Sequence, residues 1–178
     1  MGFDLDHSIE ILERTPQVLK IMLTGLSDEW THANEGAETW SAYDIVGHLI
    51  HGELTDWIPR AEVILSEGES EGESKHFTPF DRFAQFEMSK GKSLTDLLAE
   101  FEALRKKNIQ RLRSKNITMK NLGEKGIHPD FGEVSLSQLL ATWVVHDLNH
   151  IAQISRVIAK QYKDAVGPWI AYLRILQS

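Results

Sequence analysis

The sequence predicts an all-α protein: an antiparallel four-helix bundle with a short extra helix near the C-terminus. Apolar residues recur at steps of three and four in four separate segments, which is the period of an amphipathic helix. No segment alternates apolar and polar residues over a useful length, so no strand is expected. The chain shows no internal repeat and no change of composition, and its 178 residues suit one domain, residues 1–178. Four antiparallel helices are the most economical arrangement.

The first predicted helix has an apolar stripe with helical steps: Ile9, Leu12, Pro16, Leu19, Leu23 and Leu26. Pro16 lies inside this stripe. Because proline lacks the amide hydrogen that a helix interior needs, we expect the helix to break or kink there, with Thr15 capping a new turn.

The second predicted helix begins after Ser41, since Ser41 and Asp44 match the capping-box pattern. It extends to about Leu65, and Pro59 is expected to kink it. Residues 66–74 read SEGESEGES, an acidic and glycine-rich stretch that cannot bury apolar surface. A mobile loop is therefore predicted there.

Two further helices are predicted in the second half of the chain. Capping boxes at Ser93 and Ser135 mark their starts, and turn residues fill the connection 115–134. A short helix is expected after Gly167-Pro168. Four aromatic residues before the third helix are expected to cover one end of the core as a short helical turn: Phe77, Phe80, Phe83 and Phe86.

Composition limits the available chemistry. The chain has eight histidines and no cysteine, which excludes disulfides, thiolate zinc sites, iron–sulfur clusters and a cysteine nucleophile. Any bound metal must use nitrogen or oxygen ligands. The net charge of −7 argues against a nucleic-acid partner. No signal peptide or membrane-spanning run is recognised, and a cytoplasmic protein without a membrane partner is expected.

Two histidines of the fourth predicted helix, His146 and His150, are spaced i, i+4 and lie on its apolar face. A histidine in a bundle core must bond both ring nitrogens or coordinate something. One such residue is usually structural, but two at ligand spacing suggest a metal site. Asp147, between them, could orient a ligand ring or face solvent.

A third histidine, His48, points inward from the second predicted helix and could converge with this pair. Three neutral imidazoles leave a coordination position open on a divalent ion, which is typical of a catalytic site. His51, three residues later, could replace His48, add a fourth ligand or line the pocket. Asp44 could orient His48, although its role in the helix cap already explains it.

Other polar and aromatic residues are candidates for the same region. Trp143 could wall a substrate pocket or serve as a core aromatic. Asn108 occupies an expected core position and could join a polar network or bond a backbone carbonyl. Glu53 and Asp56 could supply an oxygen ligand or a general base. The chain has no G-x-S-x-G, Walker A, G-x-G-x-x-G or H-E-x-x-H motif, and a mononuclear histidine site fits best.

Three segments in order resemble the DinB/YfiT-like superfamily of metal-dependent four-helix-bundle proteins. Trp40-Ser41 followed by Asp44-Ile-Val-Gly-His48-Leu49 resembles the family's WS…HL signature. Phe131-Gly132-Glu-Val-Ser-Leu is similar to the loop before the last bundle helix. His146-Asp-Leu-Asn-His150-Ile-Ala-Gln153-Ile is similar to the HDxxHxxQI signature. The resemblance covers about residues 9–160.

This resemblance implies a pseudo-symmetric bundle, frequently a homodimer, that holds a divalent metal on His48, His146 and His150. The metal is often nickel or zinc in this family. His51 stands where other polar residues are common, which leaves the coordination number open. Characterised relatives include transferases and isomerases that use a low-molecular-weight thiol such as bacillithiol, mycothiol or glutathione.

The function expected from these observations is a divalent-metal-dependent enzyme acting on a small-molecule substrate. A thiol-dependent S-transferase or isomerase is the main prediction, with the thiol as a further cofactor. The alternatives are a metal-dependent hydrolase and a non-catalytic metal-binding bundle.

Overall fold

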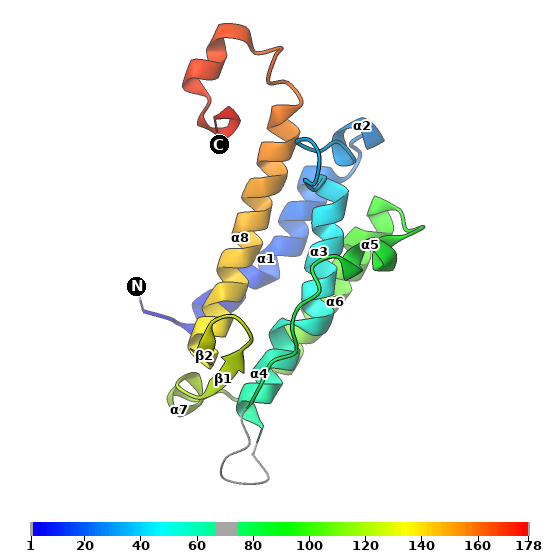
Figure 1. The fold of residues 1–178 in the computed structure, drawn as a ribbon. Helices are drawn as coiled ribbons and strands as arrows, with labels where there is room; N and C mark the ends of the chain where they lie inside the picture. Colours follow the sequence, from blue (N-terminus) through cyan, green and yellow to red (C-terminus); the bar gives the residue numbers. More distant parts are fainter. Residues whose placement is uncertain (1, 67–74, 178) are drawn as a thin grey trace.

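The computed structural model describes residues 2–66 and 75–177. Four long helical segments lie side by side and form a bundle (Figure 1). They are α1 (Leu5–Leu23), α3 followed by α4 (Ala42–Thr55 and Trp57–Leu65), α6 (Leu94–Ser114) and α8 (Leu136–Lys160). α1 packs against α6 and α8, and α3 packs against the same two helices. The predicted four-helix bundle is confirmed.

The helix directions differ in part from the fully antiparallel arrangement that was predicted. α3 runs antiparallel to α8, but α3 and α6 run in the same direction (Figure 1). Their ion pairs show this, since Glu53 bonds to Arg105 and Glu62, further along α3–α4, bonds to Arg111, further along α6. Before α6 begins, the carbonyls of Ser89 and Lys92 accept hydrogen bonds from Tyr43 near the start of α3, so α3 and α6 begin at the same end of the bundle.

Shorter elements complete the fold. Three are helical turns in the connections: α2 (Asp28–Thr31), α5 (Ala84–Ser89) and α7 (Met119–Leu122). Strands β1 (Lys125–His128) and β2 (Gly132–Ser135) form an antiparallel hairpin before α8. The 3₁₀ turns η1 (Gly167–Tyr172) and η2 (Arg174–Leu176) take the place of the short C-terminal helix that was expected.

The prediction that the chain contains no strand is wrong for this hairpin. Each strand has only four residues, so its alternation is too short to stand out in the sequence. The turn is closed at Gly132, whose φ of +71° lies in the left-handed region that glycine tolerates best. At Gly126 the hairpin lies so close to the core that an added Cβ would fall 2.5 Å from the ring of Phe77.

The capping boxes at Ser41, Ser93 and Ser135 are confirmed. In each, the serine hydroxyl accepts the backbone N–H of the residue three positions later, and that residue's side chain accepts the serine N–H. Two amide groups that the helix leaves unpaired are thus satisfied at each start. These local bonds explain why the sequence alone located three helix starts.

The two prolines act differently from each other. Of the break or kink expected at Pro16, the break is wrong, because α1 continues through this residue. Pro16 cannot donate to the carbonyl of Leu12, but Arg105 Nη1 donates to that oxygen instead, at 2.8 Å. Near Pro59 the predicted single helix divides: α3 ends at Thr55, and Asp56 separates it from α4.

The four phenylalanines do not act as one unit. Phe77 is buried in the core and Phe80 is half-buried, whereas Phe83 and Phe86 are 62% and 43% exposed. Only the last two lie at the short helix α5. Most of the predicted loop 66–74 lies outside the described residues.

The buried residues of the bundle form two apolar clusters with a polar layer between them. One cluster contains Leu12, Ile58, Ile109 and Leu140; the other contains Leu19, Leu49, Phe101 and Ile154. Between these positions the helices bury Glu53, Arg105 and Asp147. Burying charge in a protein core is costly unless the charges are paired. The polar layer therefore contains the residues whose presence needs a specific explanation.

Candidate metal centre

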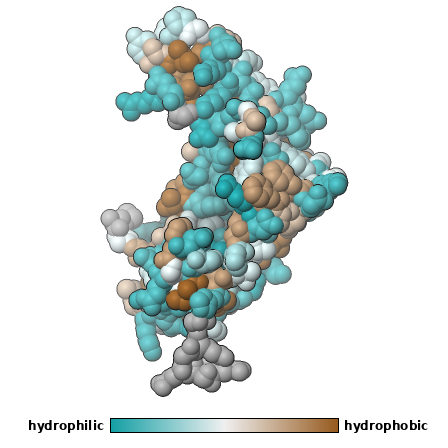
Figure 2. All heavy atoms as spheres, viewed as in Figure 1, coloured by the Kyte–Doolittle hydropathy of each residue, from teal (hydrophilic) through white to brown (hydrophobic). Residues whose placement is uncertain are grey.

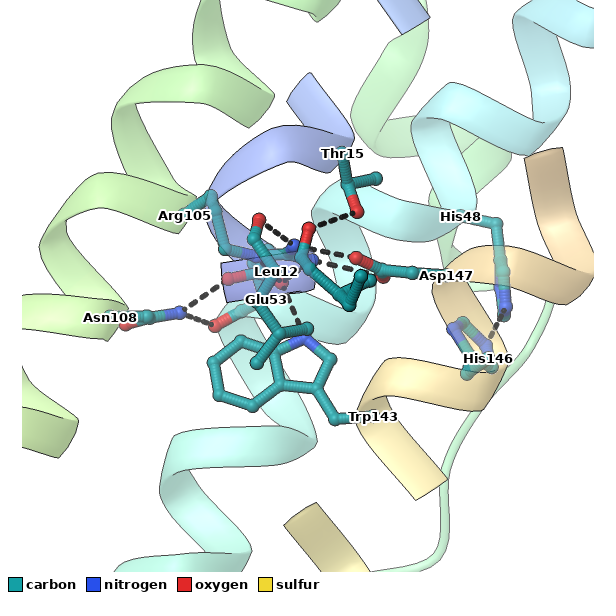
Figure 3. Close-up of polar contacts among 10 residues, drawn as sticks. Leu12, Thr15, His48, Glu53, Arg105, Asn108, Trp143, His146 and Asp147 are labelled. Carbon is teal, nitrogen blue, oxygen red and sulfur yellow. Dashed lines mark hydrogen bonds and ion pairs between the residues drawn. The ribbon is translucent and has the colours of Figure 1, made fainter. Parts of the chain in front are cut away.

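Three histidines from two helices converge in this polar layer. The Nε2 atom of His146 lies 3.1 Å from the Nε2 atoms of both His48 and His150. One nitrogen of each ring lies within 4.8 Å of the others, so the three could hold one metal ion. Figure 3 shows His48 on α3 pointing at His146 on α8. The i, i+4 spacing places His150 beside His146, and the packing of α3 against α8 adds His48.

The histidine rings are uncharged at neutral pH. Burial, together with the charges of the neighbouring His150 and His51, lowers the pKa of His48 to about 3. Burial and the charges of His150 and His48 lower the pKa of His146 to about 2. Burial also lowers the pKa of His150. A neutral imidazole is the form that offers a nitrogen lone pair to a metal.

One ring has its orientation and tautomer fixed by a hydrogen bond. Nδ1 of His150 donates to Oε1 of Gln153 at 2.8 Å. With its proton on Nδ1, the neutral ring keeps a lone pair on Nε2, the atom that faces His146. With His48 and His146, this ring forms a set of three nitrogen donors close enough together to hold one divalent cation.

Aromatic neighbours hold the other two rings. The ring centroids of Trp40 and Phe80 lie 4.8 and 5.6 Å from that of His48, and the centroid of Trp57 lies 5.0 Å from that of His146. Outside the three-histidine contact, the buried Nδ1 atoms of His48 and His146 have no hydrogen-bond partner among the described residues.

His51 and Asp44 lie near the cluster without joining it. The His51 ring packs against Phe80, 4.7 Å between centroids, and His51 does not belong to the three-histidine group. The Asp44 carboxylate accepts hydrogen bonds from the backbone and hydroxyl of Ser41, so the described contacts show its capping role and no bond to His48.

A cavity of about 540 Å³ opens beside the three histidines, which all contribute to its lining. Trp40, Trp57 and Phe80 form aromatic parts of the wall, and its charged residues are Asp56, Arg60, Arg82 and Asp130. This volume is within the range of small-molecule sites. The histidine nitrogens are thus buried in the bundle yet adjacent to a space that a substrate could occupy.

Asp56 is a buried carboxyl in this cavity, at the junction of α3 and α4. Arg60 Nε lies 2.6 Å from its Oδ1. Burial raises the pKa of Asp56 to about 6, although the charge of Arg60 acts in the opposite direction. Such a carboxyl changes its protonation state near neutral pH, which is the range in which general bases work. The sequence had named Asp56 as a candidate base, and the structure places it on the cavity wall.

Trp143 and Asn108, predicted as possible pocket residues, do not line this cavity. Both donate to Glu53: Trp143 Nε1 lies 3.1 Å from Oε1, and Asn108 Nδ2 lies 3.0 Å from Oε2 (Figure 3). Glu53 in turn accepts two bonds from Arg105, which also forms a two-bond pair with Asp147. We call these five residues the Arg105 cluster.

The sequence reasoning missed Arg105 and misplaced Asp147. Arg105 is 2% exposed, and Asp147 is fully buried with both carboxylate oxygens bonded to Arg105, so it neither faces solvent nor shows a bond to a histidine ring. The sequence did contain one indication that Arg105 is buried: it lies on the apolar face of α6, four residues after the buried Phe101. Burial acts to lower the pKa of Arg105, but the charges of Glu53 and Asp147 outweigh it and raise that pKa.

Comparison with known proteins adds to these observations. The solved structure of YfiT from Bacillus subtilis, described as a probable metal-dependent hydrolase with an unusual four-helix bundle topology, is similar with a TM-score of 0.73. The two chains share 23% sequence identity over 88% of this chain and 87% of that one. No curated protein matches the chain. Within the part of the chain that the structure describes, none of the helices has the length and apolar character needed to cross a bilayer.

A family model also matches most of the chain. The model describes the DinB superfamily, and its match extends over residues 11–154, which include the three histidines and the bundle that positions them. The chain belongs to the DinB superfamily.

Proposed function

We propose that this protein is a hydrolase that uses one divalent cation held by His48, His146 and His150. The observation that carries the proposal is the convergence of three neutral imidazole nitrogens beside a substrate-sized cavity. Three protein ligands leave at least one coordination position for water or substrate, as catalytic sites do. The chemistry that such a cation supplies is Lewis acidity, which lowers the pKa of water and polarises a substrate oxygen.

Asp56 is the residue that we assign to proton transfer. With a pKa of about 6, it is mostly ionised at pH 7 and can accept a proton from water. As the water oxygen bonds to the acyl carbon of an ester or amide, Asp56 takes that proton. When the bond to the leaving oxygen or nitrogen breaks, the proton passes to the leaving group. Arg60 holds the carboxyl in position.

Hydrolysis is preferred over the main sequence prediction for two reasons. The similar YfiT structure is described as a probable metal-dependent hydrolase, and the cavity contains a carboxyl suited to activating water. The thiol-dependent transferase or isomerase stays a prediction. Its sulfur would have to come from a small-molecule thiol, because the chain has no cysteine.

Metal binding is the first test. Calorimetric titration of the metal-free protein with Ni²⁺ and with Zn²⁺ should give one site per chain. His146→Ala should abolish tight binding, whereas His7→Ala, which removes an exposed histidine outside the cluster, should bind as the wild type does. Unchanged binding in His146→Ala would contradict the proposed site.

Turnover is the second test. The metal-loaded protein should hydrolyse members of a panel of activated esters and amides, and chelation should abolish that activity. Asp56→Asn should lower the rate by about 100-fold while metal content stays unchanged, because general bases contribute at least that much. Activity that appears only when glutathione or bacillithiol is added would favour the transferase instead. A fully metal-loaded protein inactive in both assays would favour the non-catalytic alternative.

A further inference from the structure

Arg82 has an unusual position among the charged residues of the cavity. It lines the same space as the three histidines, and its guanidinium carbon lies 5.4 Å from the ring of Trp40 and 5.7 Å from that of Phe83. Within residues 2–66 and 75–177, no carboxylate forms an ion pair with it. Arg60, the other cavity arginine, is paired with Asp56. Arg82 is therefore the cavity cation that remains available to a ligand.

The two aromatic rings favour a defined position for the Arg82 side chain. An arginine that packs over aromatic faces keeps its N–H groups free at the edge of its plane, and these groups match a carboxylate or a phosphate. Because contact with the rings already restricts the side chain, an anion that binds there orders less of it. A free cation facing a cavity is notable in a chain with a net charge of −7.

The charge of Arg82 also acts on the histidine cluster. Burial is the main cause of the lowered pKa of His48, and Arg82 contributes through its positive charge. An anion bound at Arg82 would thus lie within electrostatic range of the cation that we assign to the histidines.

A second cavity adjoins the first at this point. It has a volume of about 470 Å³, and Trp40 and Arg82 line both cavities. The exposed rings of Phe83 and Phe86 form part of its wall. Figure 2 shows apolar side chains on this face of the molecule, close to α5, with hydrophilic groups beside them. The apolar part of a ligand bound at Arg82 has these rings within reach.

We infer that Arg82 binds the anionic group of the substrate, so that the substrate is a carboxylate- or phosphate-bearing ester or amide with an apolar part against Phe83 and Phe86. This inference rests on the proposed function for the reacting bond, which lies on the histidine side of Arg82. It assigns Arg82 to substrate recognition and leaves metal binding to the histidines.

The test uses phenylacetate and phenyl phosphate as anionic probes and phenylacetamide as the uncharged counterpart of phenylacetate. Each is titrated by calorimetry, up to 10 mM, into the metal-free and the nickel-loaded full chain. At least one anion should bind the wild type, and Arg82→Ala should weaken it about tenfold, equivalent to ~1.4 kcal/mol. Arg82→Lys should lose about threefold, because it keeps the charge without the planar donor pair. The stronger anion identifies the chemical source of the charge.

Two controls make the result specific. Arg174→Ala removes an equal charge from η2, outside both cavities, and should leave anion binding unchanged. Phenylacetamide should bind Arg82→Ala as it binds the wild type. Equal losses in both arginine variants, equal losses for the amide, or no anion binding to the wild type would each overturn the inference. If the wild type binds no nickel, the proposed function fails, yet the Arg82 effect in the metal-free chain still decides this inference.

Discussion

Two neighbouring polar clusters in the middle of the bundle respond to burial in opposite ways. In the Arg105 cluster, the guanidinium donates to Glu53, to Asp147 and to the Leu12 carbonyl, so the buried charges compensate one another. In the histidine cluster, the rings lose their charge, and their nitrogens face each other beside an open cavity.

The difference separates structural from functional polarity. A cluster whose donors and acceptors are matched inside the protein needs no ligand. The Arg105 cluster is of this kind, and its bonds connect the four helices α1, α3, α6 and α8. A cluster whose Nε2 atoms converge beside a cavity can instead be completed by a ligand from outside. We therefore read the Arg105 cluster as the support and the histidines as the site.

The largest expected effect comes from breaking the closed cluster. Arg105→Met should destabilise the metal-free protein by about 3–5 kcal/mol, because Glu53 and Asp147 would remain buried without their cation. Urea denaturation followed by circular dichroism measures this change. Arg113→Ala removes an exposed arginine paired with Glu13 and should cost less than about 1 kcal/mol. Similar losses in both variants would contradict the structural role of Arg105.

Removing a histidine should reduce stability mainly when metal is present, whereas Arg105→Met reduces the stability of the metal-free protein. Nickel at about 100 times its dissociation constant should stabilise the wild type by about 2.7 kcal/mol, and His146→Ala should lose this gain. Without metal, the variant should lose much less than Arg105→Met. Thermal unfolding with and without nickel separates the two profiles. A metal-free His146→Ala as unstable as Arg105→Met would show that the clusters do not differ as we describe.

The third-largest effect is expected from acid, which should lower the free energy of unfolding through the histidine cluster. His48 has a pKa of about 3 when folded, against about 6.5 when unfolded, so the unfolded chain takes up a proton first as the pH falls. Stability is thus present above pH 6.5 and lost below it, by about 2 kcal/mol per such histidine between pH 7 and pH 5. Asp56, with its raised pKa of about 6, works in the opposite direction.

The contribution of His48 is isolated by comparison with His48→Gln. Urea denaturation of both metal-free proteins at pH 7 and pH 5 should show a smaller acid loss in the variant. Equal losses of stability in the two proteins would show that folding does not lower the pKa of His48.

The smallest effect concerns the orientation of a single ring. Gln153→Ala removes the acceptor of His150 Nδ1–H and should weaken nickel binding by about tenfold, the lower end for partners of metal-bound histidines. Stability without metal should hardly change. Gln153→Glu, which still accepts the bond, should restore the affinity measured by calorimetry. Unchanged affinity in Gln153→Ala would remove Gln153 from the site.

The sequence by itself determined the helical bundle, three helix starts and the three histidines that meet. Capping boxes and helical period depend on residues three or four apart, so they are legible in one chain. The same period placed His146 and His150 on one face and turned His48 inward.

Only the tertiary structure decided which polar residues pair. Arg105 and Glu53 are 52 positions apart, and Arg105 and Asp147 are 42 apart. Nothing local distinguishes such a buried ion pair from a solvent-exposed one. The parallel course of α3 and α6, the hairpin and the placing of Arg82 between two cavities also depend on contacts between distant segments, whose partners become definite only when the helices pack.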